Sequence, residues 1–163
     1  MTFDEISTSF WSGHPYGVQP ALTEAAVAAA ERVLGLRLPT SLLDLLRLQN
    51  GGGVSVGRSA CPTTQPTSWC EDCVPFTELM GIGTGEHGLS LTDTPYLVGE
   101  WGLPSPLVLL SGDGHCWVGL DYRSGGAAVE PAVTWFDADS GVEVPLAADF
   151  RTFVEGLRPP CFG

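Results

Sequence analysis

Two cysteines with a two-residue gap, Cys70 and Cys73, have the spacing at which both thiolates can bind one zinc ion. Cys61 lies earlier in the same polar stretch and would supply a third thiolate. Four other residues are candidates for the fourth ligand: Cys116, His87, His115 and Cys161. No second close ligand pair follows, so three interpretations stay open. One is a structural zinc held by Cys61, Cys70 and Cys73, and another is a polar loop with incidental cysteines. The third is a redox disulfide between Cys70 and Cys73, although the βαβ pattern of a thioredoxin-like setting is absent.

Three consecutive glycines, Gly51 to Gly53, could in principle cradle a phosphate. A phosphate loop of the Walker type needs a lysine and lies between a strand and the helix that follows it. This chain has no lysine, and its glycines come after an expected helix and before an expected strand. We therefore interpret them as a helix stop.

No set of residues in the sequence matches a known catalytic pattern. The three histidines fall in no H-E-x-x-H pair, and no G-x-S-x-G elbow is present. The segment that starts at Asp137 begins like a calcium loop, but its glycine comes one position too early and Ala148 stands where the final acid should be. We predict a non-enzymatic protein without a cofactor.

The charge of the chain is strongly negative. Nineteen acidic residues face seven arginines, which gives a formal net charge of −12 over 163 residues. Direct binding to nucleic acid needs clustered cations, so this balance argues against it. A basic protein partner fits the charge, and so does solubility alone.

We expect a cytoplasmic protein that does not enter a membrane. No run approaches the roughly 20 apolar residues that a membrane span needs, and the first residues lack the basic and apolar regions of a secretory signal. Disulfide bonds are not expected among the five cysteines in that compartment.

Helical patterns occupy the first third of the chain. An alanine-rich helix is predicted over residues 22–34, with Gly35 as its left-handed cap. A second, leucine-rich helix should follow Pro39, with Ser41 and Asp44 forming its capping box and Asn50 and Gly51 ending it with positive φ angles. In the irregular lead-in over residues 1–20, three aromatic residues should pack back onto the core: Phe10, Trp11 and Tyr16.

Strand patterns follow the glycines. A short strand is expected over residues 54–56, and the clearest hairpin joins residues 107–110 to 116–122 through Gly-Asp-Gly. A third strand over 133–136 and an amphipathic helix over 146–157 complete the pattern. The sequence predicts a single α+β domain over residues 1–163. It has an antiparallel sheet of about four to six strands, with N-terminal helices and a C-terminal helix packed on it. The cysteine-bearing stretch over 57–73 is expected to be a loop insertion.

The block "AAERVLGLRLPTSLLDLLRLQNGGG" resembles the signature of the SUKH superfamily, the Smi/Knr-type proteins. Its matching elements are the Ala-Glu helix, Leu-Gly, Leu-Pro, the leucine-rich helix and Asn-Gly-Gly. "LSGDGHCWVGLDYR", "VTWFDADS" and "LAADFRTFVEGL" are similar to the hairpin, last strand and C-terminal helix of the family. The resemblance covers about Leu22 to Leu157, and the cysteine stretch matches no family pattern.

The resemblance implies a binding module. Bacterial members are immunity proteins that neutralise polymorphic toxins, often nucleases, and fungal relatives are regulatory scaffolds for cell-wall synthesis. We predict a non-enzymatic immunity-type protein that binds a cognate toxin domain through an acidic surface. The alternatives are a regulatory scaffold and the zinc module. The candidate contact residues are acids and aromatics of loops: Trp69, Glu71, Asp72, Glu86, Asp93, Trp101, Asp113 and Asp121. Asp121 has a competing structural interpretation, in which it holds a turn or Arg123.

Overall fold

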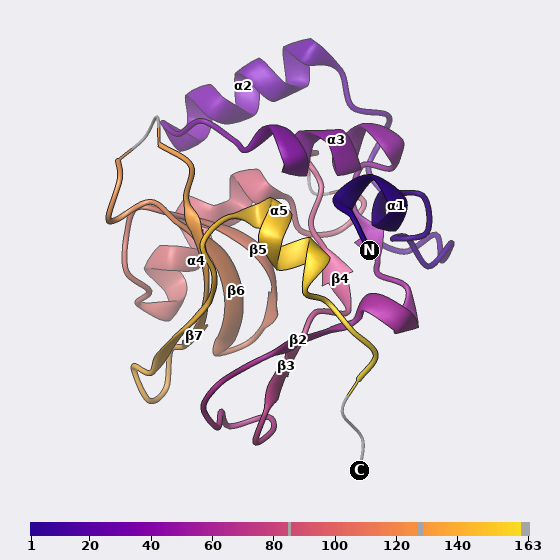
Figure 1. Ribbon diagram of the computed structural model, residues 1–163. Helices are drawn as coiled ribbons and strands as arrows, with labels where there is room; N and C mark the ends of the chain where they lie inside the picture. Colours follow the sequence, from indigo (N-terminus) through magenta and orange to yellow (C-terminus); the bar gives the residue numbers. More distant parts are fainter. Residues whose placement is uncertain (85, 127–128, 161–163) are drawn as a thin grey trace.

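A four-stranded antiparallel sheet lies at the centre of the computed structural model, which describes residues 1–84, 86–126 and 129–160 (Figure 1). Its strands neighbour one another in chain order: β5 (Leu107–Asp113), β6 (Cys116–Asp121), β7 (Ala132–Asp137) and β8 (Glu143–Ala147). Two further sheets have two strands each: β1 (Gly52–Gly53) with β4 (Glu78–Leu79), and β2 (Ala60–Pro62) with β3 (Cys73–Pro75). The fold is α+β, as predicted.

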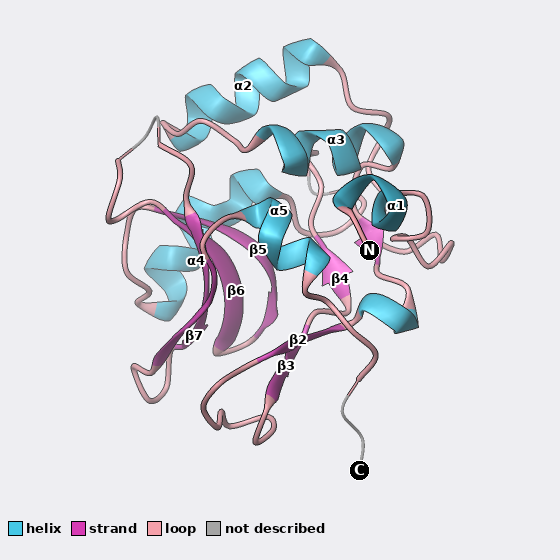
Figure 2. Cartoon of the chain, viewed as in Figure 1, coloured by secondary structure: helices cyan, strands magenta, loops and turns pink. Residues whose placement is uncertain are grey.

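The helices precede, interrupt and follow these strands (Figure 2). The α-helices are α1 (Phe3–Ser7), α2 (Glu24–Leu34), α3 (Thr40–Leu48), α4 (Thr94–Trp101) and α5 (Phe150–Glu155). Two short 3₁₀ turns cover Val56–Arg58 and Leu91–Asp93. Among the residues that the structure describes, no helix has the length and apolar character that a membrane crossing requires.

The sheet is built as the turn signals indicate. Gly114, with a φ of 58°, lies in the turn between β5 and β6, and its carbonyl accepts the indole N–H of Trp117 at 2.6 Å. Between β7 and β8 the Asp137 carboxylate accepts the backbone N–H groups of Asp139 and Ser140, at 3.0 and 3.3 Å. These local bonds fix both turns, so the predicted hairpin and third strand are confirmed.

The two helices of the first third begin differently. The Thr23 hydroxyl caps α2 by accepting the N–H of Ala26 at 3.1 Å, and Gly35 ends the helix with a φ of 67°, as predicted. The capping box predicted at Ser41 and Asp44 is wrong. Helix α3 starts at Thr40 with Pro39 as its cap, so Ser41 already lies inside the first turn and no side chain caps the helix.

The glycines end a helix, although the prediction was wrong in part. Helix α3 stops at Leu48, and Gly51 has a φ of 90° with no room for a Cβ, because one would lie 2.5 Å from the backbone nitrogen of Gly81. Asn50 does not share this conformation, since every positive φ among the described residues belongs to a glycine. Its buried amide instead donates to the Pro20 and Ile82 carbonyls, at 2.7 and 2.9 Å.

The C-terminal helix joins the sheet to the N-terminal helices. Helix α5 packs against β7 and β8 on one side and against α1 and α3 on the other. Phe150, Phe153 and Val154 of this helix are buried. The helix begins at Phe150, where Asp149 accepts the N–H of Thr152 at 2.8 Å; Leu146 and Ala147, which were predicted to be helical, belong to β8. Each buried large side chain stabilises the fold by roughly 2 kcal/mol.

The cysteine-bearing stretch contains paired strands and is not only a loop. Strands β2 and β3 pair Cys61 with Val74 and form a hairpin, and β2 also bridges to Arg158 through two backbone hydrogen bonds of 2.9 and 3.0 Å. The strand expected over residues 54–56 is instead one isolated bridge, from Trp11 to Val54, followed by a 3₁₀ turn. A stretch of mixed polar and small residues thus folds because its backbone finds partners distant in sequence.

The N-terminal lead-in contains α1 and ends in an exposed loop. Phe10 is buried and meets Trp11 edge to face at 4.9 Å, as the sequence predicts. Tyr16 does not pack back, because 69% of its surface is exposed. The exposed Tyr16 ring lines a cavity between the β2–β3 hairpin and the central sheet.

Candidate binding site

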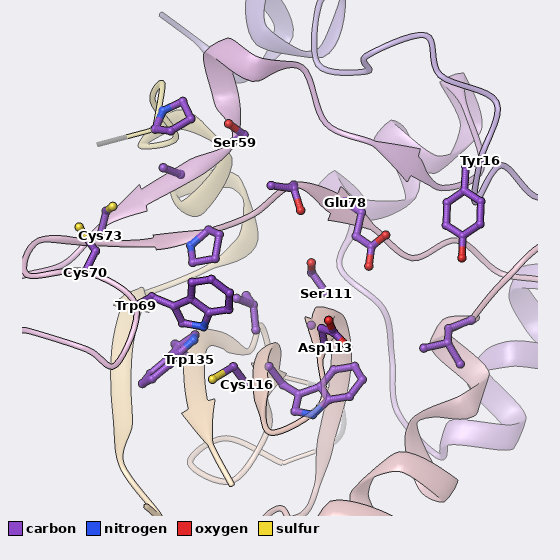
Figure 3. Close-up of a pocket in the computed structure, with 18 residues that line it drawn as sticks. Tyr16, Ser59, Trp69, Cys70, Cys73, Glu78, Ser111, Asp113, Cys116 and Trp135 are labelled. Carbon is purple, nitrogen blue, oxygen red and sulfur yellow. The ribbon is translucent and has the colours of Figure 1, made fainter. Parts of the chain in front are cut away.

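A cavity of about 750 Å³ lies between the β2–β3 hairpin and the turn end of strands β5 and β6 (Figure 3). Its volume falls within the range of pockets that bind ligands or partner side chains. Its lining includes residues of the hairpin, of β4 and of the central sheet. The hairpin contributes Trp69, Cys70 and Cys73; β4 contributes Glu78; and the sheet contributes Ser111, Asp113, Cys116, Trp117 and Trp135.

Hydrogen bonds within the hairpin tip place Trp69 over the sheet. The Thr67 hydroxyl accepts the backbone N–H groups of Trp69 and Cys70, at 3.2 and 3.3 Å, and the Thr67 N–H donates to the Cys70 carbonyl at 2.9 Å. The Ser68 hydroxyl lies 3.9 Å from the Cys116 thiol at the start of β6. The tip is therefore a tight turn that contacts the sheet, with the Trp69 indole forming one wall of the cavity.

Two carboxylates from neighbouring strands face the same space. The Met80 N–H donates to the Leu110 carbonyl at 2.8 Å, which brings β4 alongside β5 and Glu78 near Asp113. In Figure 3, Glu78, Ser111 and Asp113 lie together on one side of the cavity. Burial raises the pKa of the Glu78 carboxyl, and the nearby Asp113 carboxylate raises it further.

No cation within the described residues neutralises these acids. The cavity lining contains no arginine or histidine, and neither Glu78 nor Asp113 forms an ion pair with another described residue. Two like charges in a partly desolvated cavity repel each other. The interior of the cavity therefore favours a positively charged group.

The rim of the cavity is apolar and exposed. Tyr16, Trp69 and Leu89 are exposed by 69%, 59% and 47%, and all three line the opening. These residues belong to three separate segments of the chain, and folding brings them to the same cavity. Exposed apolar side chains around a polar centre are typical of protein-binding surfaces.

A second acidic group lies where β6 and β8 flank β7, and it contains its own cation. Arg123 donates to both oxygens of Asp121, at 2.9 and 2.8 Å, and to both oxygens of Glu143, at 3.2 and 2.6 Å. The Arg123 guanidinium also lies 5.6 Å from the centre of the Phe136 ring. These hydrogen bonds lower the pKa of Asp121. Asp121 therefore holds Arg123, as its structural interpretation predicted.

The structure brings two of the eight predicted contact residues into the cavity, Trp69 and Asp113. Glu71 and Asp72 are exposed on the same hairpin tip but outside the lining. The others lie elsewhere: Glu86 on an exposed loop, Trp101 at the end of α4, and Asp93 in a cap where it accepts the Ser90 N–H at 2.8 Å.

Sequence reasoning missed Glu78, Tyr16 and Leu89. One signal was available for Glu78, which is the single acid in the short apolar run "VPFTELMGIG". Tyr16 and Leu89 gave none, because an exposed apolar residue in a loop cannot be told from a buried one without the fold.

The predicted zinc ligands are only partly brought together. The ligand atoms of Cys70, Asp72 and Cys73 lie within 4.8 Å of one another, and those of His115, Cys116 and Asp137 do the same. Cys61 belongs to neither group. Its thiol lies in the hydrophobic core, where burial raises its pKa to about 12. Cys161, one candidate for a fourth ligand, falls outside the described residues.

The Cys116 thiol of the cavity is not activated as a nucleophile. Burial raises the pKa of Cys116, although hydrogen bonds from Trp69 and Ser68 offset part of that effect. A thiol held in its neutral form is a poor nucleophile. The arrangement is suited to holding a cation rather than to attacking a substrate.

Comparison with known proteins gives one match. The family model for the SMI1 / KNR4 family (SUKH-1) matches residues 21–156. Searches of curated proteins and of solved structures gave no significant match.

Proposed function

Because the chain belongs to the SMI1 / KNR4 family (SUKH-1), we propose that it is a non-enzymatic immunity-type protein. It binds and neutralises a cognate bacterial toxin domain, with a nuclease as the expected class. Family membership by itself supports an immunity-like or regulatory role exercised through protein partners. The toxin, the acidic interface and the cytoplasmic location belong to the proposal, as does the absence of direct nucleic-acid and membrane binding.

The observation that carries the proposal is the cavity. Glu78 and Asp113 supply negative charge that no described arginine or histidine of the lining neutralises, and the exposed side chains of Trp69 and Tyr16 line the same cavity. A nuclease presents clustered cations to the phosphates of its substrate. An acidic cavity with an apolar rim complements such a face and would cover it by occlusion, without any chemical step.

Co-purification tests the proposal. The tagged chain is expressed together with the gene immediately upstream, and the complex is examined for one-to-one stoichiometry. The same cells are scored for survival when the upstream gene is induced. A stoichiometric complex that restores growth is the expected result. Absence of both binding and protection would contradict the immunity role.

The regulatory scaffold is the first alternative. A scaffold would bind proteins of its own cell and would need no toxin gene beside it. An immunity gene, in contrast, should lie directly downstream of a toxin gene. Reading the neighbouring genes therefore separates the two roles before any protein is made.

The zinc module is the second alternative, and the closeness of Cys70, Asp72 and Cys73 is the observation that favours it. Asp72 also forms an ion pair with Arg158 at 3.5 Å, which a metal would have to disturb. Elemental analysis of the purified chain tests this alternative. Close to one equivalent of zinc, lost in the Cys70→Ser variant, would support it, and less than about a tenth of an equivalent would end it.

A further inference from the structure

We propose that the cavity receives the guanidinium group of an arginine side chain carried by the partner protein. This inference deepens the proposed function and rests on it for the identity of the partner. It assigns a chemical specificity to Glu78, Asp113 and Trp69, which line one space from three different elements (Figure 3).

The charge of the site is the first argument. The structure pairs other acids internally: Glu24 and Asp44 with Arg47, and Asp121 and Glu143 with Arg123. Glu78 and Asp113 have no such cation among the described residues, although Glu78 is half-buried. Placing a cation between them would relieve their repulsion and satisfy carboxylates that the fold leaves unpaired.

The shape and composition of the site favour a planar cation with many donors. Two carboxylates and the Ser111 hydroxyl offer acceptors on neighbouring strands, and the Trp69 indole offers a flat apolar face as another wall of the same cavity. A guanidinium group carries five N–H donors in one plane and stacks on aromatic rings. An ammonium group is compact and strongly hydrated, and it uses such a spread of acceptors less well.

A metal ion fits these acids less well. Neither Glu78 nor Asp113 belongs to a set of three ligand atoms close enough to share an ion, as far as the described residues were searched. The cavity of about 750 Å³ also exceeds what a bare ion fills. An arginine together with the backbone that carries it occupies such a space, and the exposed Tyr16 and Leu89 side chains would contact that flanking backbone.

The test uses the full chain and a defined probe, the blocked tripeptide acetyl-Gly-Arg-Gly-amide. Binding is followed by two-dimensional NMR at the indole N–H of Trp69. Two comparison peptides carry citrulline, which keeps the shape but has no charge, or lysine. We expect the arginine peptide to shift the Trp69 signal with a dissociation constant of the order of 1 mM. Citrulline should bind at least ten times more weakly, and lysine at least three times more weakly.

Matched variants connect the binding to the acids. Glu78→Gln with Asp113→Asn should weaken the arginine peptide at least tenfold. Asp4→Asn with Glu100→Gln removes the same formal charge from exposed positions outside the cavity and should change binding less than twofold. If the first double variant loses its dispersed spectrum, the two single variants replace it, each with an expected loss of at least threefold.

The outcomes separate this inference from the function beneath it. Equal binding of citrulline and arginine, lysine binding as tight as arginine, or no shift at Trp69 would overturn the guanidinium assignment. Capture of a toxin in co-purification would still support the immunity role after any of those results. Conversely, selective arginine binding by a chain that captures no toxin would uphold the site and contradict the immunity role.

Discussion

Two pairs of acids differ in whether the fold supplies a cation: Asp121 with Glu143 on the central sheet, and Glu78 of β4 with Asp113 of β5. Asp121 and Glu143 surround Arg123, whose guanidinium donates to all four of their oxygens. Glu78 and Asp113 face an open cavity whose lining, as far as the structure describes it, contains no arginine. The two carboxylates of each group have a formal charge of −2. In the first group Arg123 reduces the net charge to −1.

This difference shows which of the many acidic side chains are available to bind a partner. Hydrogen bonds from Arg123 lower the pKa of Asp121, whereas burial and Asp113 raise the pKa of Glu78. In the first group the carboxylates stabilise the fold, and in the second their charge opposes it. A net charge of −12 does not distinguish the two, so the binding argument rests on the unpaired group alone.

Supplying the cavity with its own cation should give the largest effect. Asp113→Arg places a guanidinium beside Glu78 and makes the second group resemble the first. We expect the affinity for the toxin partner to fall at least 100-fold, about 3 kcal/mol, with the fold retained because Asp113 is exposed. Isothermal titration measures the affinity. Glu100→Arg makes the same charge change at an exposed position outside the cavity and should cost less than threefold; an equal loss there would show that the loss follows total charge and not the cavity.

Removing the cation from the first group should cost stability and leave binding unchanged. Arg123→Met deletes the hydrogen bonds to Asp121 and Glu143 and leaves their carboxylates facing each other. Arg123 is one-third exposed, so water moderates the loss, and we expect about 1–2 kcal/mol in the free energy of unfolding by urea. Partner affinity should stay within twofold. A large loss of affinity in a folded variant would show that the paired group also binds.

Much of the fold could be predicted from the sequence because its elements are marked locally. Gly35 caps α2, and the Gly-Asp-Gly sequence forms the turn that connects β5 to β6. The spacing of Phe150 and Phe153 indicates a buried helix face. One wrong prediction is local, because α3 begins before Ser41 and the expected capping box does not form; another concerns a residue whose partners are distant in sequence. The Asn50 amide reaches Pro20 and Ile82, so a residue read as a turn former is a buried link between segments.

The candidate site was predicted less completely for the same reason. Trp69 and Asp113 were chosen as loop aromatic and loop acid, and both line the cavity. Glu78 was overlooked, because its role depends on a single backbone contact that brings β4 beside β5. A cavity formed by a hairpin tip, a strand edge and two loops has no continuous sequence pattern, whereas a helix cap is encoded within a few residues.

The pH dependence of stability should have opposite signs in the two groups. Because the pKa of Glu78 is raised above 4.5 in the folded chain, its ionised form costs stability at pH 7, and that cost disappears below about pH 4.5. Because the pKa of Asp121 is lowered below 3.8, its contribution persists until the pH falls through that lower value. Each effect should be below about 1 kcal/mol.

Urea unfolding at two pH values measures both signs. Glu78→Gln should stabilise the chain at pH 7 and make little difference at pH 4. Asp121→Asn should destabilise it at pH 7 and still do so at pH 4, where the folded carboxyl remains ionised. If both variants changed stability in the same direction at pH 7, the distinction between paired and unpaired acids would be lost.

The smallest effect should be one in which the two groups behave alike. Long-range attraction of a basic partner depends on total charge, so neutralising either pair of acids removes the same formal charge and should slow association by about twofold. Stopped-flow mixing at 20 mM and 150 mM salt measures the association rate, and the difference from the wild type should shrink as screening increases.

The dissociation rate should distinguish the two pairs of acids. Glu78→Gln with Asp113→Asn removes contacts made in the bound complex, whereas Asp121→Asn with Glu143→Gln does not. If both double variants dissociate at the wild-type rate, the negative charge steers the partner toward the chain but the cavity does not hold it.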